Sequence, residues 1–462
     1  MRKNIDMLNG PLGPAIIRFA IPVFLITLLQ NLFGTVDLVM IGQFCGSLEV
    51  AAISATSTLT IALVNLFTGL SLGAGLTVAR ALGTRRTEDV FLAVHTSVFT
   101  ALIGGVILSV VGTIFSPTML KMMDTPQDVL PLATVYIRIY FSGVIFTVVY
   151  NFGAAILRAV GDTKTPLYFL IISGILKVIL NLFFLAVCKL GVAGVAIATI
   201  LSQAVSVGLI LLALTRRTDD CKLTLKKLRM HKKPLLDILR IGLPAGIQSS
   251  LFSISNIITA AALNSFDSAA VISADGATRS LELFTDAIDI GFAQAIPNFV
   301  AQNLGAHQYD RIKKSFMLCA GFGAVFIFTA SMFICLFAKP LLGLYITDSP
   351  EAISYGLLRM RYLLIPNFIM LTMAVSAGGL QGLGHSLAAS VISLMTGCVL
   401  RVIWTYTVFA IPQYHTLDCL YVIYPISWVL TTAIAGTLFF HFLKKKSQTA
   451  LPASSLSEKE SA

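Results

Sequence analysis

The chain has 462 residues, of which 56% are hydrophobic and only 12% are charged. Soluble domains carry about 25% charged residues, so this composition excludes an ordinary water-soluble protein. Lys and Arg outnumber Asp and Glu by 33 to 22, but the basic residues stand in short runs between apolar stretches, so the net charge of +11 does not indicate nucleic-acid binding.

Long apolar stretches divide the chain. Three of them, Val98–Phe115, Leu167–Val187 and Ile426–Phe442, approach or exceed the roughly 20 residues that a membrane-spanning helix needs. They lack the alternation of apolar and polar residues that is typical of transmembrane β-strands. The sequence therefore predicts an all-α polytopic membrane protein. Its twelve spans are expected near residues 14–41, 52–79, 91–115, 131–156, 166–188, 191–214, 237–263, 276–300, 315–338, 354–378, 386–411 and 418–443.

Two features of the sequence bear on processing and on disulfides. The first apolar run extends from Ala15 to Ile41 and is too long for the core of a signal peptide, so the first helix is expected to stay in the mature protein. The seven cysteines are scattered. Because their number is odd and their spacing is not paired, they predict neither a disulfide framework nor a zinc site.

Basic residues gather in alternate loops. Cytoplasmic loops retain Lys and Arg, so these loops and both termini are predicted to be cytoplasmic. Arg359 and Arg361, inside the tenth span near the opposite side, are the local exception. The one long basic loop, from Arg216 to Lys233, is predicted to anchor the chain at the cytoplasmic face, and specific lipid binding is the alternative.

The two halves of the chain resemble each other at an offset of about 222 residues. Pro22 falls on Pro244, and Ala79–Gly83 falls on Ala301–Gly305. Each half contains six spans, so the halves are expected to share one orientation about a pseudo-two-fold axis along the membrane normal, with a cavity between them. With one or two residues of drift, the further matches are Pro117 with Pro340, Asp124 with Asp348, Gly161 with Gly384, and Gly174 with Gly397. The predicted parts are an N-terminal six-helix bundle (1–214), a basic cytoplasmic linker (215–236), a C-terminal six-helix bundle (237–443) and a disordered cytoplasmic tail (444–462).

Motifs over nearly the whole chain carry a resemblance to one family. They are Ile21–Gly42, Gly75–Gly83, Leu157–Pro166, Gly191–Thr199 and Val300–Ala306. In these stretches the sequence resembles the multidrug and toxic compound extrusion (MATE) family. The resemblance implies twelve helices in two bundles and export of organic cations in exchange for Na⁺ or H⁺. It also implies that Asp37, which matches the family's first-helix Asp, binds the coupling cation.

Asp37 lies among apolar residues near the outer end of the first span. An ionisable residue inside a span is costly, so it predicts a functional site; a solvated interfacial carboxylate is the alternative. Where many members of the family have Asn and Asp four residues apart in the fifth span, this chain has Lys177 and Asn181. A buried ammonium seeks a carboxylate, so we predict a Lys177–Asp37 ion pair with Asn181 beside it, a cation-coupling group that argues against a simple Na⁺ site. Snorkelling of Lys177 to the interface is the alternative.

The eighth span carries the densest acidic group. Glu282, Asp286 and Asp289 lie on one stripe of the helix, within about 60° of one another. Carboxylates do not face lipid, so we predict that they face the cavity, with Glu282 in cation coupling and Asp286 and Asp289 in substrate binding. The alternative is a structural network with Arg279, one turn earlier, and a basic residue from another helix such as Arg401.

Uncharged polar residues inside the spans are weaker candidates, because membrane helices also use such residues to bond to one another. Pro22 and Pro244 occupy equivalent positions in the two halves and are candidate hinges. The candidates for substrate contact are Gln30, Asn31, Asn151, Gln248 and Asn256.

These features predict a secondary active exporter of amphipathic organic cations, working by alternating access in the plasma (inner) membrane. The alternative is a lipid-linked oligosaccharide or polysaccharide flippase of the same superfamily, which Lys177 and Arg401 favour and the acidic stripe disfavours. The six His residues are dispersed and no phosphate-binding GxxxxGK[ST] loop occurs, so neither an enzyme nor an ATP-driven pump is expected. We expect no cofactor or metal apart from the coupling ion, H⁺ or Na⁺. The expected partners are small amphipathic cations and membrane lipids, not nucleic acid, and the chain is expected to be a monomer.

Overall fold

The computed structural model of the chain describes residues 4–347 and 349–450, and every regular element within them is helical. Asp348, one of the positions used to align the repeat, and the tail beyond residue 450 lie outside this part. In the N-terminal half the elements are α1 (Leu12–Phe44), α2 (Ser47–Thr84), α3 (Thr87–Met122), α4 (Leu130–Ser142), α5 (Val144–Ala159), α6 (Lys164–Leu182), the π-helical turn η1 (Phe183–Val187) and α7 (Gly191–Thr215). In the C-terminal half they are α8 (Lys232–Asn264), α9 (Ala269–Gly305), α10 (Tyr309–Leu336), α11 (Ala338–Gly343), α12 (Pro350–Leu363), α13 (Asn367–Gly382), α14 (Ser386–Leu394), the π-helical turn η3 (Met395–Val399), α15 (Leu400–Tyr406), the 3₁₀ turn η4 (Pro412–Tyr414) and α16 (Leu417–Ala450).

The described helices account for the twelve predicted spans. Nine are long and apolar enough to cross a membrane by themselves, counting α6 with η1 and α14 with η3 and α15, and two bent pairs, α4 with α5 and α12 with α13, give two more. The twelfth is α9, which is less apolar because it carries several charged residues. The predicted fold class, an all-α polytopic membrane protein with twelve spans, is confirmed.

Two spans predicted as single helices are broken. The chain bends by 46° between α4 and α5 at Gly143 and by 41° between α12 and α13 just before Asn367. Pro366 explains the second break, because proline disfavours the helical conformation of the residue before it and lacks a backbone donor. At Gly143 the side chain of Ile200 fills the space that a Cβ would need, and glycine is a poor helix former.

Helix ends extend beyond the predicted spans because polar residues cap them outside the apolar part. Ser268 accepts a hydrogen bond from the backbone N–H of Val271 at the start of α9, and Ser349 does the same for Ala352 at the start of α12. At the other end of the chain, α16 continues to Ala450. Residues 444–450, which we expected to be disordered, are therefore helical, since a helix that is already formed propagates at little cost.

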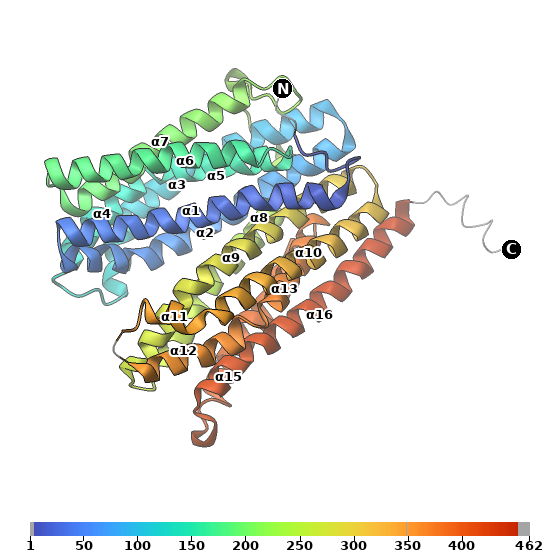
Figure 1. Cartoon of the computed structure of the whole chain (residues 1–462). Coiled ribbons are helices and arrows are strands. Elements are labelled where there is room, and N and C mark those ends of the chain that lie inside the picture. The colour runs from blue at the N-terminus through green and yellow to red at the C-terminus, as the bar shows by residue number, and fades with distance from the viewer. Residues whose placement is uncertain (1–3, 348, 451–462) are drawn as a thin grey trace, which may run out of the picture. The chain divides into compact units, whose positions relative to one another are not determined.

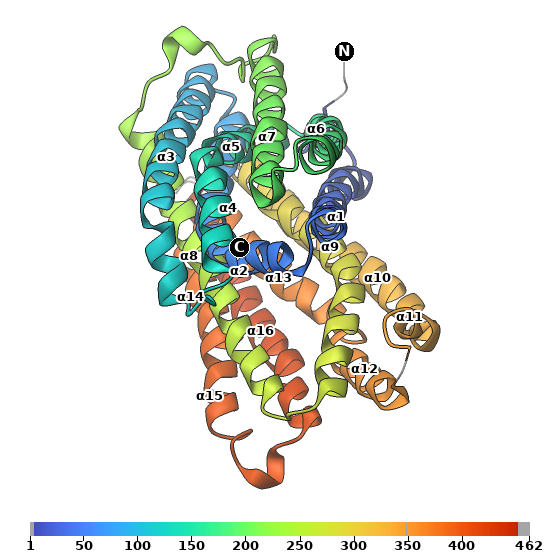
Figure 2. The ribbon, with the colours of Figure 1, turned by 90° about the vertical axis from the view of Figure 1, so that its left-hand side faces the viewer.

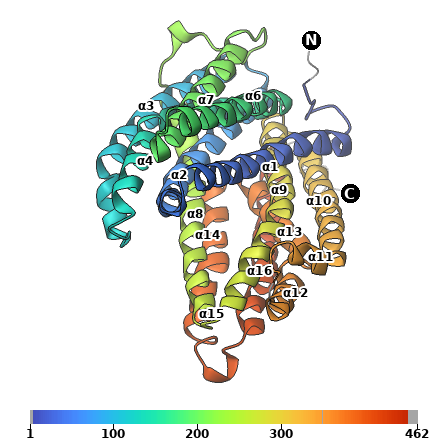
Figure 3. The same cartoon turned by 60° about the vertical axis from the view of Figure 1, so that its left-hand side comes forward.

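The helices form two compact units. The first contains Pro22–Ala81 and Arg86–Ser253, and the second contains Ile5–Ile21, Leu82–Arg85 and the described residues from 254 to 450. Both α1 and α8 therefore contribute residues to both units. In the first unit α3 packs on α4 and α5, while α7 packs on α4, α5 and α6 (Figures 1 and 2). In the second unit α9, α10, α13 and α16 lie side by side (Figure 3).

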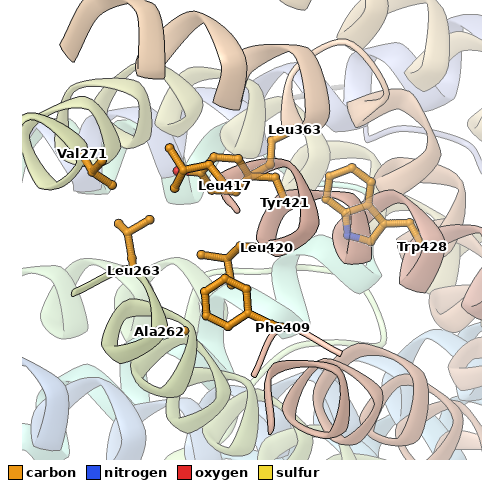
Figure 4. Packing of buried hydrophobic residues seen from close by; sticks show 9 residues of the cluster. All are labelled: Ala262, Leu263, Val271, Leu363, Phe409, Leu417, Leu420, Tyr421 and Trp428. Carbon is orange, nitrogen blue, oxygen red and sulfur yellow. The ribbon is translucent and has the colours of Figure 1, made fainter. Parts of the chain in front are cut away.

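A core cluster of the second unit anchors the loop between α15 and α16. Phe409 of this loop packs with Leu420 of α16, beside Tyr421 and Trp428 of the same helix (Figure 4). Burial of such aromatic side chains is a large apolar contribution to the stability of a fold. The loop between α15 and α16 is therefore packed, through Phe409, against the N-terminal part of α16. The other members of the cluster are Ala262, Leu263, Val271, Leu363 and Leu417.

The basic loop between α7 and α8 is folded against the first unit. The backbone N–H of Thr224 donates to Nε2 of His95 at 3.1 Å, and the N–H of His231 donates to the hydroxyl of Thr96 at 3.2 Å. Cys221 is fully buried in this loop, and burial raises the pKa of its thiol to about 12. Tertiary contacts therefore position the loop, in addition to the membrane anchoring that its basic residues predict.

Two helices of the first unit cross at glycines. A Cβ on Gly69 of α2 would overlap the backbone of Gly246 in α8, and a Cβ on Gly73 would overlap the carbonyl of Ile238. Small residues spaced four apart let membrane helices approach backbone to backbone. Ser250 strengthens the crossing by donating its hydroxyl to the carbonyl of Ala62 at 2.8 Å.

We expect Gly69→Ala to destabilise the protein by about 1–3 kcal/mol, because the added methyl group overpacks this crossing. Gly208 of α7 is the matched control, since nothing lies within 4 Å of a Cβ added there. Alanine at 208 should be neutral or stabilising by up to about 1 kcal/mol, because it is the better helix former. Thermal unfolding of the purified proteins in detergent measures both changes. Equal effects of the two substitutions would contradict the close crossing.

Candidate functional site

The first unit contains the predicted polar group of α1 and α6. Nζ of Lys177 lies 2.5 Å from Oδ2 of Asp37, and Nδ2 of Asn181 donates to Oδ1 of Asp37 at 2.7 Å. The side chains of Lys177 and Asp37 are 17% and 13% exposed, and Asn181 is fully buried. The predicted ion pair and the neighbouring amide are confirmed as a contact. Lys177 is held by a carboxylate and is not snorkelling to an interface.

This arrangement occupies both oxygens of the Asp37 carboxylate, one with an ammonium and one with an amide. Oδ1 of Asn181 is buried and, within the described chain, has no hydrogen-bond partner. A cation that displaced the ammonium of Lys177 would find carboxylate and amide oxygens there, the donors that hard cations prefer. Tyr136 of α4, which the sequence did not single out, lies within electrostatic range of Asp37.

In the second unit Glu282 belongs to an ion-pair network. Nη2 of Arg359 on α12 lies 2.9 Å from Oε2 of Glu282, and Nη1 lies 2.8 Å from Oδ1 of Asp275. Arg359 is buried, with its side chain only 5% exposed. Arg279 lies 4.0 Å from Asp275, with its side chain 54% exposed. The partner of Glu282 is therefore Arg359. The sequence marked Arg359 only as an exception in the charge pattern of the loops and did not mark Asp275.

The remaining two carboxylates of the stripe are placed differently. Asp286 is half-buried and Asp289 is buried on α9, and neither forms an ion pair with any residue that the structure describes. Oδ1 of Asp289 also lacks a hydrogen-bond partner within the described residues. The stripe therefore divides into an ion-paired end at Glu282 and an end at Asp286 and Asp289 that forms no ion pair within the described residues. Arg359 and Arg279 act on Asp286 only over a longer distance.

Arg401, the other partner considered for the stripe, does not contact it. Its Nε and Nη2 donate to the hydroxyl of Ser427 at 3.1 and 2.9 Å, and its guanidinium lies over the ring of Tyr424, 4.2 Å from the centroid. Arg401 therefore takes no part in the alternative network with the acidic residues of α9, because α16 supplies the partners of this arginine.

The uncharged polar candidates are not brought together at one site. Gln30 is exposed on α1, Asn31 and Asn151 are half-buried, and Gln248 is half-buried with an Oε1 that has no partner within the described chain. The side chain of Asn256 lies outside the described residues. The candidate hinges Pro22 and Pro244 lie inside α1 and α8, respectively. Among the described residues no group of three His, Cys, Asp or Glu side chains is arranged to hold a metal ion.

An all-helical chain with twelve spans and buried charges within them has the architecture of a membrane transporter. One family model, MatE, matches the chain twice, over residues 22–183 and 244–407. The two matches begin 222 residues apart (244 minus 22), the offset of the predicted repeat. The chain therefore belongs to the MatE family of transporters, as the motifs predicted.

Several relatives align over most of the chain. It is 28% identical to the "Probable multidrug resistance protein YoeA" of Bacillus subtilis over 449 residues, and this alignment covers 94% of each protein. It is 26% identical over 364 residues to an "FAD transporter" of Shewanella oneidensis, covering 77% of this chain and 79% of that protein. It is 22% identical over 449 residues to the "Multidrug export protein MepA" of Staphylococcus aureus, covering 95% of each.

Solved structures share the fold. An outward-facing multidrug resistance MATE transporter of the MOP superfamily superposes with a TM-score of 0.86 at 22% identity, over 97% of this chain and 99% of that one. A MOP superfamily transporter from Pyrococcus furiosus, whose binding pocket is described as reversed in polarity, gives a TM-score of 0.88 at 20% identity, over 96% and 99%. At these identities the likeness concerns the fold alone.

Proposed function

We propose that the protein is a secondary active exporter of amphipathic organic cations, driven by an inward gradient of H⁺ or Na⁺. The observation that carries this proposal is the pair Asp286 and Asp289, two carboxylates on a membrane-spanning helix of a transporter that form no ion pair with any described residue. A buried carboxylate is costly unless a cation neutralises it. Relatives named as multidrug resistance or multidrug export proteins support export of drugs.

In this proposal the two ion-paired groups serve coupling. The carboxylates of Asp37 and Glu282 are each held by a basic residue of another helix, Lys177 and Arg359, respectively. Protonation of a carboxylate, or its capture by a metal cation, weakens such an ion pair and releases one helix from the other. Occupancy by the coupling cation would thereby favour the state that releases the substrate outward.

The flippase alternative needs free cationic groups for a lipid phosphate. Of the two residues that favour it, Lys177 is engaged by Asp37, whereas Arg401 forms no ion pair within the described residues. This single guanidinium is outweighed by the carboxylates of Asp286 and Asp289, which repel a phosphate. The exporter is therefore the better supported function.

The test is efflux of a fluorescent cation, rhodamine 6G, from proteoliposomes under a pH gradient and a Na⁺ gradient imposed separately. We expect one gradient to drive export and its collapse by an ionophore to abolish it. Export unaffected by both gradients, or no export under either, contradicts the proposal. Liposomes carrying the Asp37→Asn protein should show no gradient-driven export.

The acidic end of α9 gives a second prediction. We expect Asp289→Asn to weaken binding of rhodamine 6G about 10-fold or more, because it removes a desolvated carboxylate. Binding of the cation should also release a proton in weakly buffered detergent solution, and the substitution should reduce that release. Asp128→Asn, on an exposed loop, is the control and should change neither quantity. If Asp286→Asn and Asp289→Asn both left affinity and proton release unchanged, the stripe would be structural.

We further propose that both termini and the basic loops are cytoplasmic. Four exposed positions test this orientation: Arg86 and Lys313 on the basic side, Met122 and Lys339 on the other. Cysteines at 86 and 313, in a background lacking the native accessible cysteines, should resist a membrane-impermeant maleimide in intact cells, whereas cysteines at 122 and 339 should react. Cys221 needs no replacement, because it is fully buried and its pKa is raised. Reaction on the opposite face at any position contradicts the orientation.

A further inference from the structure

Arg401 is a buried cation without an anionic partner. It stands on α15, and only 7% of the residue is exposed. Its hydrogen bonds go to one neutral acceptor, the hydroxyl of Ser427, and its flat face lies on the ring of Tyr424. No carboxylate of the described chain forms an ion pair with it. This arginine therefore carries its charge inside a span with neutral neighbours only.

Two other cations inside the spans form ion pairs. Arg359 has two carboxylates at 2.8 and 2.9 Å, and Lys177 has one at 2.5 Å. A guanidinium cannot lose its charge in a protein, and it presents five N–H donors in a planar fork that matches a carboxylate or phosphate. A cation–π contact offsets only part of the cost of burying an ion. Among the described residues Arg401 therefore lacks the anionic partner that Arg359 and Lys177 have.

The surroundings of Arg401 favour an aromatic ligand. Tyr424 and Trp428 of α16 meet edge to face with ring centroids 6.2 Å apart, and Tyr421 and Trp428 belong to the cluster in Figure 4. Trp404 of α15 packs against the same cluster, together with the flexible side chains of Met370 and Met373. Aromatic and methionine side chains adapt to flat apolar ligands.

The backbone beside Arg401 is also unusual. The π-helical turn η3, Met395–Val399, ends two residues before this arginine. Such turns interrupt an α-helix at a cost and occur frequently at functional sites. The other π-helical turn of the described chain, η1, follows Asn181 of the Asp37 site at a similarly short distance. Both therefore lie next to polar groups inside a span.

We propose that Arg401, with Ser427 and Tyr424, forms a subsite for the acid group, carboxylate or phosphate, of an aromatic substrate. This inference rests on the export function proposed above and widens its substrate class. The protein would accept zwitterionic aromatic molecules as well as simple cations.

Two dyes that differ in one group test this subsite. Rhodamine B carries a free carboxylate and is a zwitterion at neutral pH, whereas its ethyl ester is a cation of nearly the same size and shape. Their affinities for the purified protein in detergent are measured by fluorescence anisotropy. We expect Arg401→Gln to weaken binding of rhodamine B by about 10–100-fold, the loss of a charge-assisted hydrogen-bonded pair, and binding of the ester by less than 3-fold.

Two further variants sharpen the result. Arg401→Lys keeps the charge but lacks the planar fork, so its loss of rhodamine B affinity should be intermediate. Arg361→Gln, on the exposed side of α12, is the matched control and should bind both dyes like the natural protein. Thermal unfolding verifies that each variant is folded, and Arg401→Lys provides the comparison if the glutamine variant fails to fold.

The outcomes separate this inference from the proposed function. Equal weakening of both dyes, or of neither, by the Arg401 variants overturns the acid subsite; equal weakening would indicate that Arg401 pairs with a carboxylate of the protein in another conformation. If the ester is still exported from proteoliposomes in that case, cation export stands and only the subsite fails. If the natural protein neither binds nor exports the ester, the proposed function itself is wrong.

Discussion

Arg359→Met should destabilise the protein by about 3–5 kcal/mol, because it leaves two carboxylates buried without their cation. Arg359 contacts Asp275 and Glu282 at 2.8 and 2.9 Å, and the three side chains are at most 19% exposed. Methionine fills a similar volume, so the loss reports the charge more than the packing. The measurement is thermal or chemical unfolding of the purified protein, with retention of the folded species on gel filtration.

Arg361 provides the control for this change. It lies two residues further along α12 and is exposed, so Arg361→Met should change stability by less than about 0.5 kcal/mol. The double variant Arg359→Met/Glu282→Gln should regain part of the loss, since one of the two stranded charges is removed. An Arg359→Met protein as stable as the Arg361→Met protein would show that the network contributes nothing to the fold.

Single alanine substitutions at Asp37 and Lys177 should each abolish gradient-driven export and destabilise the protein, by about 3–5 kcal/mol for a buried pair that loses one member. The ion pair at 2.5 Å joins α1 to α6, so either substitution leaves the opposite charge stranded inside the membrane span. The double substitution Asp37→Ala/Lys177→Ala should be less destabilising than the sum of the two, with a coupling of about 0.5–3 kcal/mol.

Measurements of export distinguish a purely structural role of the Lys177–Asp37 pair from a role in cation coupling. If the pair only holds α1 to α6, the double variant regains transport together with stability. If Asp37 also binds the coupling cation, as proposed, the double variant regains stability but not gradient-driven export. Strictly additive stability changes would show that the two residues do not interact. Asp128→Ala serves as the control for removal of a carboxylate that is exposed on a loop.

The approximate spans and the repeat followed from the sequence because both depend on local composition. A run of apolar residues long enough to cross a bilayer forms a helix whatever its neighbours are, since the backbone has no other way to satisfy its hydrogen bonds in lipid. The breaks inside two of the spans were harder to predict from the sequence. Pro366 offered a signal for the bend between α12 and α13, whereas the bend at Gly143 depends on the Ile200 side chain packed against it.

The Lys177–Asp37 pair was also predictable, because few residues inside the spans could neutralise each other and these two matched in depth. The partner of Glu282 was not. Helical periodicity places side chains on a face of their own helix but carries no information on which residue of another helix faces them. Arg359 and Arg401 are similar in sequence terms, each an arginine inside a span, and only Arg401 was considered as a partner, within the alternative reading of the stripe.

The sequence by itself thus determined the class of protein, its twelve helices, its duplication and which charges had to be buried, because each of these follows from hydrophobicity and spacing along one chain. Only the tertiary structure decided how those charges are neutralised. It gives Arg359 two carboxylates, leaves Asp286 and Asp289 without an ion pair among the described residues, and places Arg401 against Tyr424 and Ser427. The physical reason is that an ion pair forms over a few ångströms between residues 77 to 140 positions apart in sequence, a distance set by how helices pack and not by any property of the segments themselves.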